Sequence, residues 1–298
     1  MVTEVAEANF YMMAVARMKA FAELLKIRLS ALVAFSCAFG YALAMPSDIQ
    51  WQNLLMVYLG GFFMSGAAVT INQVIERDLD KLMTRTLGRP LPTGRVSVQE
   101  AIIFAMLCLL GSTVVLWIYA NPLTVVLSLI SMVLYSFVYT PLKRVGPIAV
   151  FVGAIPGALP PLLGWIAATG TISHEAMIIF GIQFIWQFPH FWAIAWVADD
   201  DYKKAGFKLL PSGGGKDLNT AVQIMIYTMF LIPLGLLPAK FGITGIDSAI
   251  VATVCGIAFF AATFSLLKTG SRKSALWIMF GSFLYLPIVQ IAYLLDKV

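Results

Sequence analysis

The sequence has little charge and few cysteines. Charged residues make up 12% of the 298 positions and hydrophobic residues 60%, whereas an average soluble domain carries about 25% charged residues. Cys37, Cys108 and Cys255 stand far apart in apolar stretches and form no C-x-x-C pair, so neither a zinc site nor a disulfide framework is indicated. Because no soluble domain is left over, we expect no binding to nucleic acid.

The first 25 residues form a polar to amphipathic segment that contains Glu4, Glu7 and Glu23. They lack the basic start and apolar stretch of a signal peptide, and their acids argue against a transit peptide. We predict a cytoplasmic N-terminal segment at 1–25, within a single domain that covers residues 1–298.

Long apolar stretches dominate the rest of the chain. Each has roughly the 17–25 residues that cross a bilayer as a helix, and glycine and proline are tolerated inside such helices. The sequence therefore predicts an all-α polytopic protein, embedded in a lipid bilayer, with nine transmembrane helices. Their expected positions are 29–46, 54–75, 101–119, 122–140, 148–167, 176–197, 219–238, 246–266 and 275–294.

The basic residues are confined to alternate connections between these spans. Every Lys and Arg except Lys240 and Lys297 falls before the first span or in the second-to-third, fourth-to-fifth, sixth-to-seventh and eighth-to-ninth connections. With nine spans these segments share one face, which the positive-inside rule assigns to the cytoplasm. We expect a multi-pass protein of the inner (cytoplasmic) membrane, with its N-terminus inside and its C-terminus outside.

An acidic, arginine-rich loop follows the second span, from Asn72 to Arg95. Asn72, Glu76 and Asp80 are four residues apart and would form one stripe on a helix. Their amide and carboxylate oxygens are hard ligands suited to Mg²⁺, which also shares phosphate oxygens. The alternative is a solvated helix end with mixed ion pairs, but ionisable groups at an apolar edge are costly and usually functional.

The same loop carries arginines after its acids. Arg85 and Arg89 repeat the four-residue step, and a guanidinium can grip phosphate bidentately. We expect the helix to continue through them and to end at Pro90 and Pro92. The pattern indicates a magnesium-bound diphosphate at the membrane surface.

A second acidic loop, from Trp186 to Gly206, follows the sixth span on the same face. His190 and Asp201 are eleven residues apart, so on a continuous helix they can share a face about 16 Å apart along the axis. Asp201 would lie at the surface and His190 deep in the bundle. Three consecutive acids cannot all point one way, so we expect Asp201 and one of its neighbours to bind metal or diphosphate. For His190, the alternative is a buried histidine bonded to a neighbouring helix.

The two loops mirror each other. Each follows an even-numbered span, carries bases after its acids and ends in a Leu-Pro pair, Leu91-Pro92 and Leu210-Pro211. We expect a pseudo-two-fold bundle that places both loops over one cavity.

These motifs resemble those of the intramembrane aromatic prenyltransferases, and the resemblance extends from about Lys26 to Pro287. Asn72-x-x-x-Glu76-x-x-x-Asp80 is similar to the first aspartate-rich motif of that superfamily, with Glu76 in place of the usual aspartate. Other stretches resemble its heme O synthase branch: Met83-Thr84-Arg85-Thr86, Arg89-Pro90-Leu91-Pro92, Tyr139-Thr140-x-Leu142-Lys143-Arg144, Gly157-Ala158-Leu159-Pro160-Pro161-x-x-Gly164-Trp165, Pro189-His190-Phe191 and Asp201-Tyr202-x-x-Ala205-Gly206.

The resemblance implies a prenyltransferase-type bundle with active-site loops on the cytoplasmic side. It implies transfer of a farnesyl group from farnesyl diphosphate to a vinyl group of protoheme IX (heme B), with water addition, giving heme O and diphosphate. Mg²⁺ is the implied cofactor, and a downstream heme-modifying enzyme is a candidate partner. The resemblance implies that Asn72, Glu76, Asp80 and Asp201 are metal ligands and that the same four residues and Asp200 are catalytic. The residues implied to bind the diphosphate are Arg77, Arg85, Arg89, Lys143, Arg144 and Lys204. Those implied to bind the acceptor are His190, Trp186 and Tyr202.

Two other functions compete with this one. A prenyltransferase that acts on a quinone precursor or a porphyrin-like pigment would keep both acidic loops and differ only in its cavity. A transporter could also contain an internal repeat, but transporters usually place ionisable residues near mid-membrane. Here nearly all the acids lie at one surface, which disfavours coupled transport.

Overall fold

The computed structural model describes residues 2–45, 48–213 and 215–298, and within these ranges every regular element is a helix. The first half contains α1 (Val2–Leu24), α2 (Ile27–Ala44), α3 (Trp51–Ile75), α4 (Arg77–Asp80), α5 (Val98–Tyr119), α6 (Pro122–Val133), the π-helix η1 (Leu134–Tyr139) and α7 (Thr140–Leu142). The second half contains α8 (Ile148–Thr169), α9 (His174–Val197), α10 (Asp199–Lys204), α11 (Leu218–Leu234), α12 (Leu237–Lys240), α13 (Ile246–Thr269) and α14 (Arg272–Leu295).

Nine helical segments of the described residues are long and apolar enough to cross a membrane, so the predicted number of spans is confirmed. One span combines α6, η1 and α7, and another combines α11 and α12. All nine lie within three residues of their predicted ends. The agreement follows from the length and composition of the apolar stretches, which a bilayer dictates.

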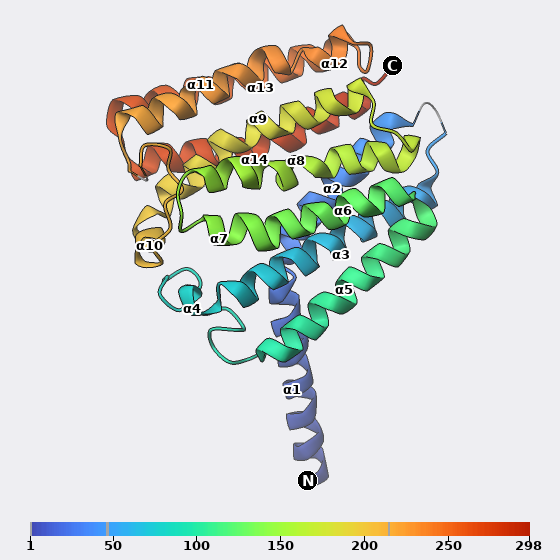
Figure 1. The fold of residues 1–298 in the computed structure, drawn as a ribbon, viewed down its shortest axis with the longest axis vertical. Helices are drawn as coiled ribbons and strands as arrows, with labels where there is room; N and C mark the ends of the chain where they lie inside the picture. The colour runs from blue at the N-terminus through green and yellow to red at the C-terminus, as the bar shows by residue number, and fades with distance from the viewer. Residues whose placement is uncertain (1, 46–47, 214) are drawn as a thin grey trace.

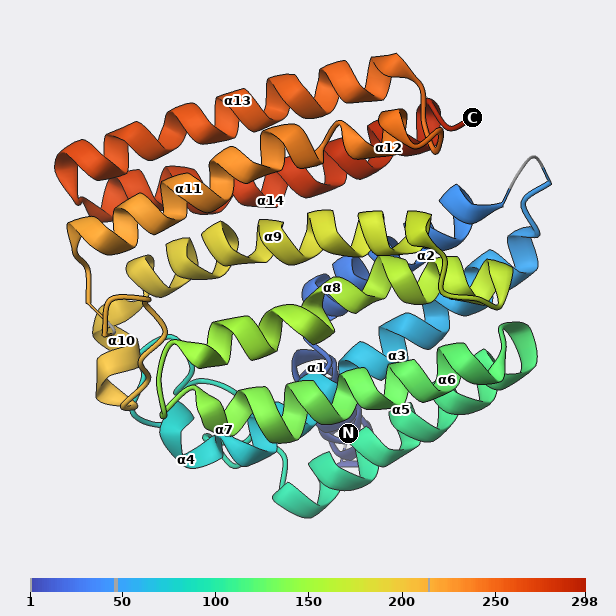
Figure 2. The same ribbon diagram turned by 45° about the horizontal axis from the view of Figure 1, so that its top comes forward.

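The spanning helices run side by side, and the short helices α4 and α10 lie together at one end of the bundle (Figure 1). The C-terminus lies at the opposite end, and α1 points away from the bundle across the direction of the spans (Figure 1). The same arrangement is visible in Figure 2. Chain neighbours pack against each other, as in α2 with α3, and α8 packs against both α2 and α9.

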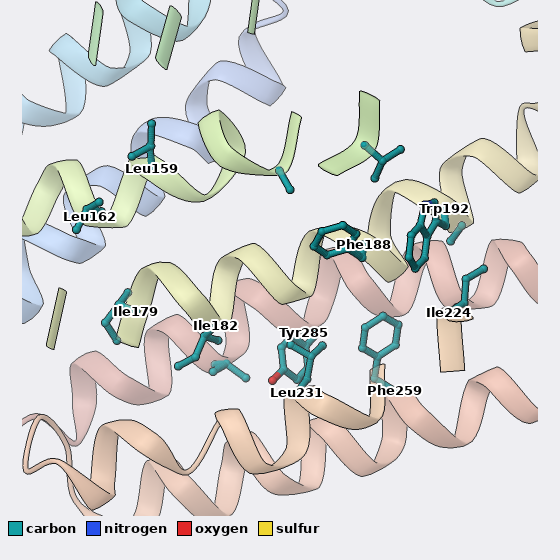
Figure 3. Packing of buried hydrophobic residues seen from close by; sticks show 14 of the residues in the cluster. Leu159, Leu162, Ile179, Ile182, Phe188, Trp192, Ile224, Leu231, Phe259 and Tyr285 are labelled. Carbon is teal, nitrogen blue, oxygen red and sulfur yellow. The ribbon is translucent and has the colours of Figure 1, made fainter. Parts of the chain in front are cut away.

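Close helix contacts hold α2 against α8. A side chain on Gly164 would overlap the carbonyl oxygen of Cys37, and one on Gly40 would overlap the carbonyl oxygen of Pro161. Small residues let membrane helices approach closely, and this close packing matters because apolar burial alone contributes little to helix association in a bilayer. On the other side of α8 the packing is by larger side chains. Leu159, Leu162, Ile179, Ile182, Phe188, Trp192, Ile224, Leu231, Phe259 and Tyr285 belong to the core that joins α8, α9, α11, α13 and α14 (Figure 3).

Prolines inside α8 leave backbone carbonyls without their helical partners, because proline has no N–H. Pro160 and Pro161 leave the carbonyl oxygens of Pro156 and Gly157 unpaired within the helix. Gln183 of α9 donates to Gly157 O at 2.9 Å, and Ser131 of α6 lies 3.5 Å from Pro156 O. The polar residues inside these spans therefore satisfy backbone groups that lipid cannot.

Two local predictions were wrong. The helix after the second span ends at Asp80 rather than at Pro90, and residues 81–97 form a series of turns. The hydroxyl of Thr86 donates to Asp80 O at 2.9 Å, which replaces a helical bond at that point. The second acidic segment is not one continuous helix either, because Ala198 separates α9 from α10 with φ −98° and ψ 8°.

Candidate active site

A cavity of about 460 Å³ runs from the loop after α3 into the bundle. Its walls are largely apolar and come from α2, α3, α6, η1, α8, α9 and α14. Charged and polar side chains line the loop end of the cavity. Aromatic and amide side chains of α9 line a deeper part of it. The lining includes nine of the predicted site residues: Asn72, Glu76, Asp80, Arg85, Arg89, Lys143, Trp186, His190 and Tyr202.

Asp80 is completely buried and is bound on one side only. Its Oδ2 accepts a hydrogen bond from Arg89 Nη1 at 2.7 Å. Its Oδ1 is buried and has no hydrogen-bond partner among the described residues. A buried carboxylate oxygen without a partner is costly, so this atom is suited to a ligand that the protein alone does not supply.

Glu76 forms a buried ion pair with Lys143. Lys143 Nζ donates to Glu76 Oε1 at 2.8 Å, and the two side chains are 11% and 5% exposed. The ammonium group also lies 4.8 Å from the centre of the Tyr139 ring. Burial lowers the pKa of Lys143, but the Glu76 carboxylate together with Tyr135 and Tyr202 raises it above its usual range. The ion pair therefore favours the charged form of the lysine at the cavity wall.

Asn72 is oriented by Thr140, the first residue of α7. Its amide nitrogen donates to Thr140 Oγ1 at 2.9 Å, and Thr140 Oγ1 in turn donates to Tyr135 O at 2.9 Å. The hydroxyl proton of Thr140 is thus used, so Asn72 must present its N–H to Thr140 and keep its amide oxygen free of that contact. The amide oxygen of Asn72 thus stays available in the cavity that Glu76 and Asp80 also line.

Asp201 joins the two acidic loops. Its carboxylate accepts the backbone N–H of Thr84 at 3.2 Å and that of Arg85 at 3.0 Å. Lys204 Nζ bridges Asp201 Oδ1 at 2.9 Å and Thr84 Oγ1 at 3.1 Å. Lys204 and these N–H groups hold the pKa of Asp201 well below its usual range. The two loops meet at one end of the cavity, as their mirrored sequences predict.

The aromatic ring of Tyr202 extends this junction into the cavity. The guanidinium carbon of Arg85 lies 5.7 Å from the centre of that ring. Five predicted residues, however, do not line the cavity. Asp201 and Lys204 belong to the junction of the loops, and the other three are Asp200, Arg77 and Arg144. Asp200 is 86% exposed and lies 3.6 Å from Lys216, and Arg77 contacts Val74 O and Asp78.

Lys26 lines the same cavity and was missed by the sequence analysis. It joins α1 to α2 in a left-handed conformation, with φ 45° and ψ 57°. Thr70 and Gln73 hold this joint by donating to Leu24 O at 3.3 and 2.8 Å. Burial, together with the nearby charges of Arg89 and Lys143, lowers the pKa of Lys26 to about 7. No sequence signal marks a lysine at this φ, where glycine is usual.

A model of a known family matches residues 33–286 and is described as the UbiA prenyltransferase family. The chain belongs to the UbiA prenyltransferase family. A relative from Cytophaga hutchinsonii, named protoheme IX farnesyltransferase, is 56% identical over 280 residues, which cover 94% of this chain and 98% of the relative. Family membership makes the chain a prenyltransferase.

Solved structures of the UbiA family share the fold. A digeranylgeranylglyceryl phosphate synthase matches with a TM-score of 0.77 at 21% identity, over 94% of this chain and 98% of its own. A UbiA homologue from Archaeoglobus fulgidus, bound to GPP and Mg²⁺, matches with a TM-score of 0.65 at 17% identity, over 92% and 99%. The all-helical bundle with nine candidate spans is thus the UbiA-type bundle.

The oxygen ligands at the loop end fit a magnesium ion. Asn72, Glu76, Asp80 and Asp201 offer hard oxygens, and Asp80 Oδ1 is the buried one without a partner. Among the residues that the structure describes, no three Asp, Glu, His or Cys side chains cluster into a metal site of their own.

Proposed function

We propose that this UbiA-family enzyme transfers a farnesyl group from farnesyl diphosphate to a vinyl group of protoheme IX, with addition of water, to give heme O and diphosphate. The relative from Cytophaga hutchinsonii supports this choice of substrates, because it is 56% identical and is named protoheme IX farnesyltransferase. The observation that carries the proposal is the cavity itself, which has carboxylates and cations at one end and a buried imidazole deeper inside.

The cations at the loop end would bind the diphosphate. Arg89 reaches Asp80, Lys143 reaches Glu76, and Arg85 stands at the junction of the loops. In the proposed complex these side chains donate some of their hydrogen bonds to the diphosphate oxygens. The planar guanidinium group of arginine is suited to such contacts. Lys204 supports the junction from Asp201.

Mg²⁺ is part of the proposal, and the UbiA homologue from Archaeoglobus fulgidus described as bound to GPP and Mg²⁺ supports it. Asn72, Glu76, Asp80 and Asp201 would hold the ion. When bound, it would offset charge on the leaving diphosphate.

The chemistry would proceed by ionisation. The bond between farnesyl C1 and the diphosphate oxygen breaks, and its electron pair leaves with the diphosphate, where Arg85, Arg89 and Lys143 offset the charge. The vinyl π-electrons of protoheme form the new carbon–carbon bond to C1. Water adds to the carbocation left beside the porphyrin ring and loses a proton. The apolar walls shield the allylic cation from early capture by water.

The acceptor would lie against α9. Trp186 stacks on His190 with ring centres 4.4 Å apart, and Tyr202 lines the cavity at the loop end. We assign these three side chains to binding of the porphyrin. His190 is 9% exposed and would present a ring nitrogen to the acceptor.

The proposal is tested by incubating the purified protein with Mg²⁺, farnesyl diphosphate and protoheme, followed by mass analysis of the porphyrin. We expect a product that has gained a farnesyl group and one water. Unmodified protoheme alongside prenylation of a quinone precursor would overturn the heme assignment.

We also propose that both acidic loops face the cytoplasm in an inner membrane. The supporting pattern is the confinement of Lys and Arg to that face. A cysteine placed at the position of Asp78 should react with an impermeant thiol reagent only after the membrane is opened; labelling of intact cells would contradict the orientation. A downstream heme-modifying enzyme that accepts the product remains the proposed partner.

A further inference from the structure

Ser282 of α14 is the only described side chain that hydrogen-bonds His190, and neither sequence motif includes it. His190 Nδ1 and Ser282 Oγ are 2.8 Å apart. Ser282 is fully buried. A serine hydroxyl has one proton to donate and two lone pairs to accept with, so the direction of this bond depends on where that proton goes.

The Ser282 proton is already used. Ser282 Oγ donates to Met279 O, one turn earlier on α14, at 2.6 Å. Ser282 Oγ must therefore accept from His190, which puts the imidazole proton on Nδ1. In the neutral ring the other nitrogen, Nε2, then carries a lone pair and no proton.

The ring is fixed in this orientation by its neighbours. Trp186 stacks on its face at 19° between ring planes and donates its own indole N–H to Ser282 O at 3.1 Å. Phe283 packs against it edge-on, with ring centres 5.0 Å apart. His190 lines the cavity, and the described residues give its Nε2 no hydrogen bond. The nitrogen with the lone pair thus belongs to the cavity.

We infer that Ser282 is a positioning residue that fixes the tautomer of His190, so that Nε2 ligates the iron of a metalloporphyrin acceptor. The inference rests on the proposed function, which supplies an acceptor that contains iron. A histidine that binds a metal commonly donates its other N–H to an oxygen, which fixes both tautomer and ring orientation. Ser282 Oγ is that oxygen here, and Trp186 holds the same residue from its backbone side.

The test compares ferric protoheme with metal-free protoporphyrin IX on the purified full-length protein. Ser282→Ala should weaken protoheme affinity about tenfold, because the ring can then take the tautomer with a proton on Nε2. Its heme absorption and electron paramagnetic resonance spectra should move toward those of His190→Ala. Affinity for the metal-free porphyrin should not change, since it has no iron to ligate.

Two further variants separate positioning from packing. Ser282→Thr keeps the hydroxyl and should keep the wild-type heme spectrum. Ser112→Ala removes another buried hydroxyl, which donates to Gly60 O at 2.7 Å. Ser112 does not line the cavity, so this variant should leave both porphyrin affinities unchanged. A Ser282→Ala protein with the wild-type heme spectrum, or one that loses both porphyrins equally, would overturn the inference.

The wild-type protein distinguishes this inference from the proposed function. Farnesylation of protoheme without a nitrogen ligand in the spectrum would overturn the role of Ser282 and leave the proposed reaction standing. A nitrogen-ligated heme that gains no farnesyl group would overturn the proposed reaction instead.

Discussion

The Asp201 carboxylate accepts the backbone N–H of Arg85 at 3.0 Å, across 116 positions of the chain. This contact ties the loop after α3 to the start of α10, and Thr84 and Lys204 reinforce it. Asp201 therefore holds the two acidic loops together, in addition to its proposed role as a metal ligand.

Replacing Asp201 with alanine should release this junction. We expect turnover to fall about 100-fold or more, the range seen when a group that stabilises transition-state charge is removed. Trypsin should cut faster at Lys81 and Arg85, because the turns that contain them lose their anchor. Asp78→Ala is the matched control, since Asp78 is exposed and its ion pairs among the described residues are with its neighbours Arg77 and Lys81. Unchanged turnover in Asp201→Ala would contradict the diphosphate assignment.

The pH range over which this junction stays intact follows from the lowered pKa of Asp201. An acid whose pKa is depressed in the folded protein contributes stability above its unfolded pKa, near 3.9, and loses it as the pH falls toward the folded pKa. Tryptic protection of Arg85 should therefore be constant through neutral pH. Loss of protection between pH 6 and 8 would show that another group controls the junction.

The Glu76–Lys143 pair should respond differently to single and double replacement. Removing one partner of a buried pair leaves an uncompensated charge and costs about 3–5 kcal/mol. We expect Glu76→Gln to lower the thermal unfolding temperature clearly, and Glu76→Gln with Lys143→Met to recover much of it. Both proteins should lose activity. Equal destabilisation in the single and double variants would mean that the pair is not coupled.

Arg89→Lys tests bidentate binding of the diphosphate. Lysine keeps the charge but loses the planar pair of donors, and hydrogen bonds to charged groups contribute about 1.5–3 kcal/mol. The KM for farnesyl diphosphate should rise about tenfold or more, with little change in KM for protoheme. An unchanged KM for farnesyl diphosphate would argue against the assigned contact.

Lys26 should make diphosphate binding depend on pH. Its pKa is lowered to about 7, so in the free enzyme the side chain is charged below that pH and neutral above it. The affinity for farnesyl diphosphate should weaken as the pH rises from 6 to 8, and Lys26→Met should bind weakly with a flatter profile. The comparison with Lys26→Met corrects for ionisation of the substrate itself. Identical profiles for the two proteins would exclude Lys26 from the site.

Much of this fold could be predicted from the sequence, because a bilayer imposes simple rules. Apolar stretches of sufficient length become spans. The segregation of the basic residues to one face is obtained with an odd number of spans. The candidate site residues at the end of α3 could be predicted for a related reason. Asn72 and Glu76 stand at an apolar edge, where a polar side chain needs a function or a partner.

The rest depended on contacts between distant segments. The helix ends at Asp80 and not at Pro90 because the N–H groups of Thr84 and Arg85 bond to Asp201, which no local pattern reveals. The pairing of Glu76 with Lys143 and the left-handed Lys26 joint also need the assembled bundle. Nothing in the sequence distinguishes Ser282 from other small residues of a span, because its role depends on the contact between α14 and His190.

The most direct test of the proposed farnesylation of protoheme is the reaction itself, run in isotopically labelled water. Purified protein, Mg²⁺, farnesyl diphosphate and protoheme should yield a porphyrin whose mass has increased by one farnesyl group and one water, with the label in the new hydroxyl group. A farnesylated porphyrin without the label would contradict capture of the cation by water. Recovery of unmodified protoheme from a protein that prenylates another ring compound would contradict the central claim.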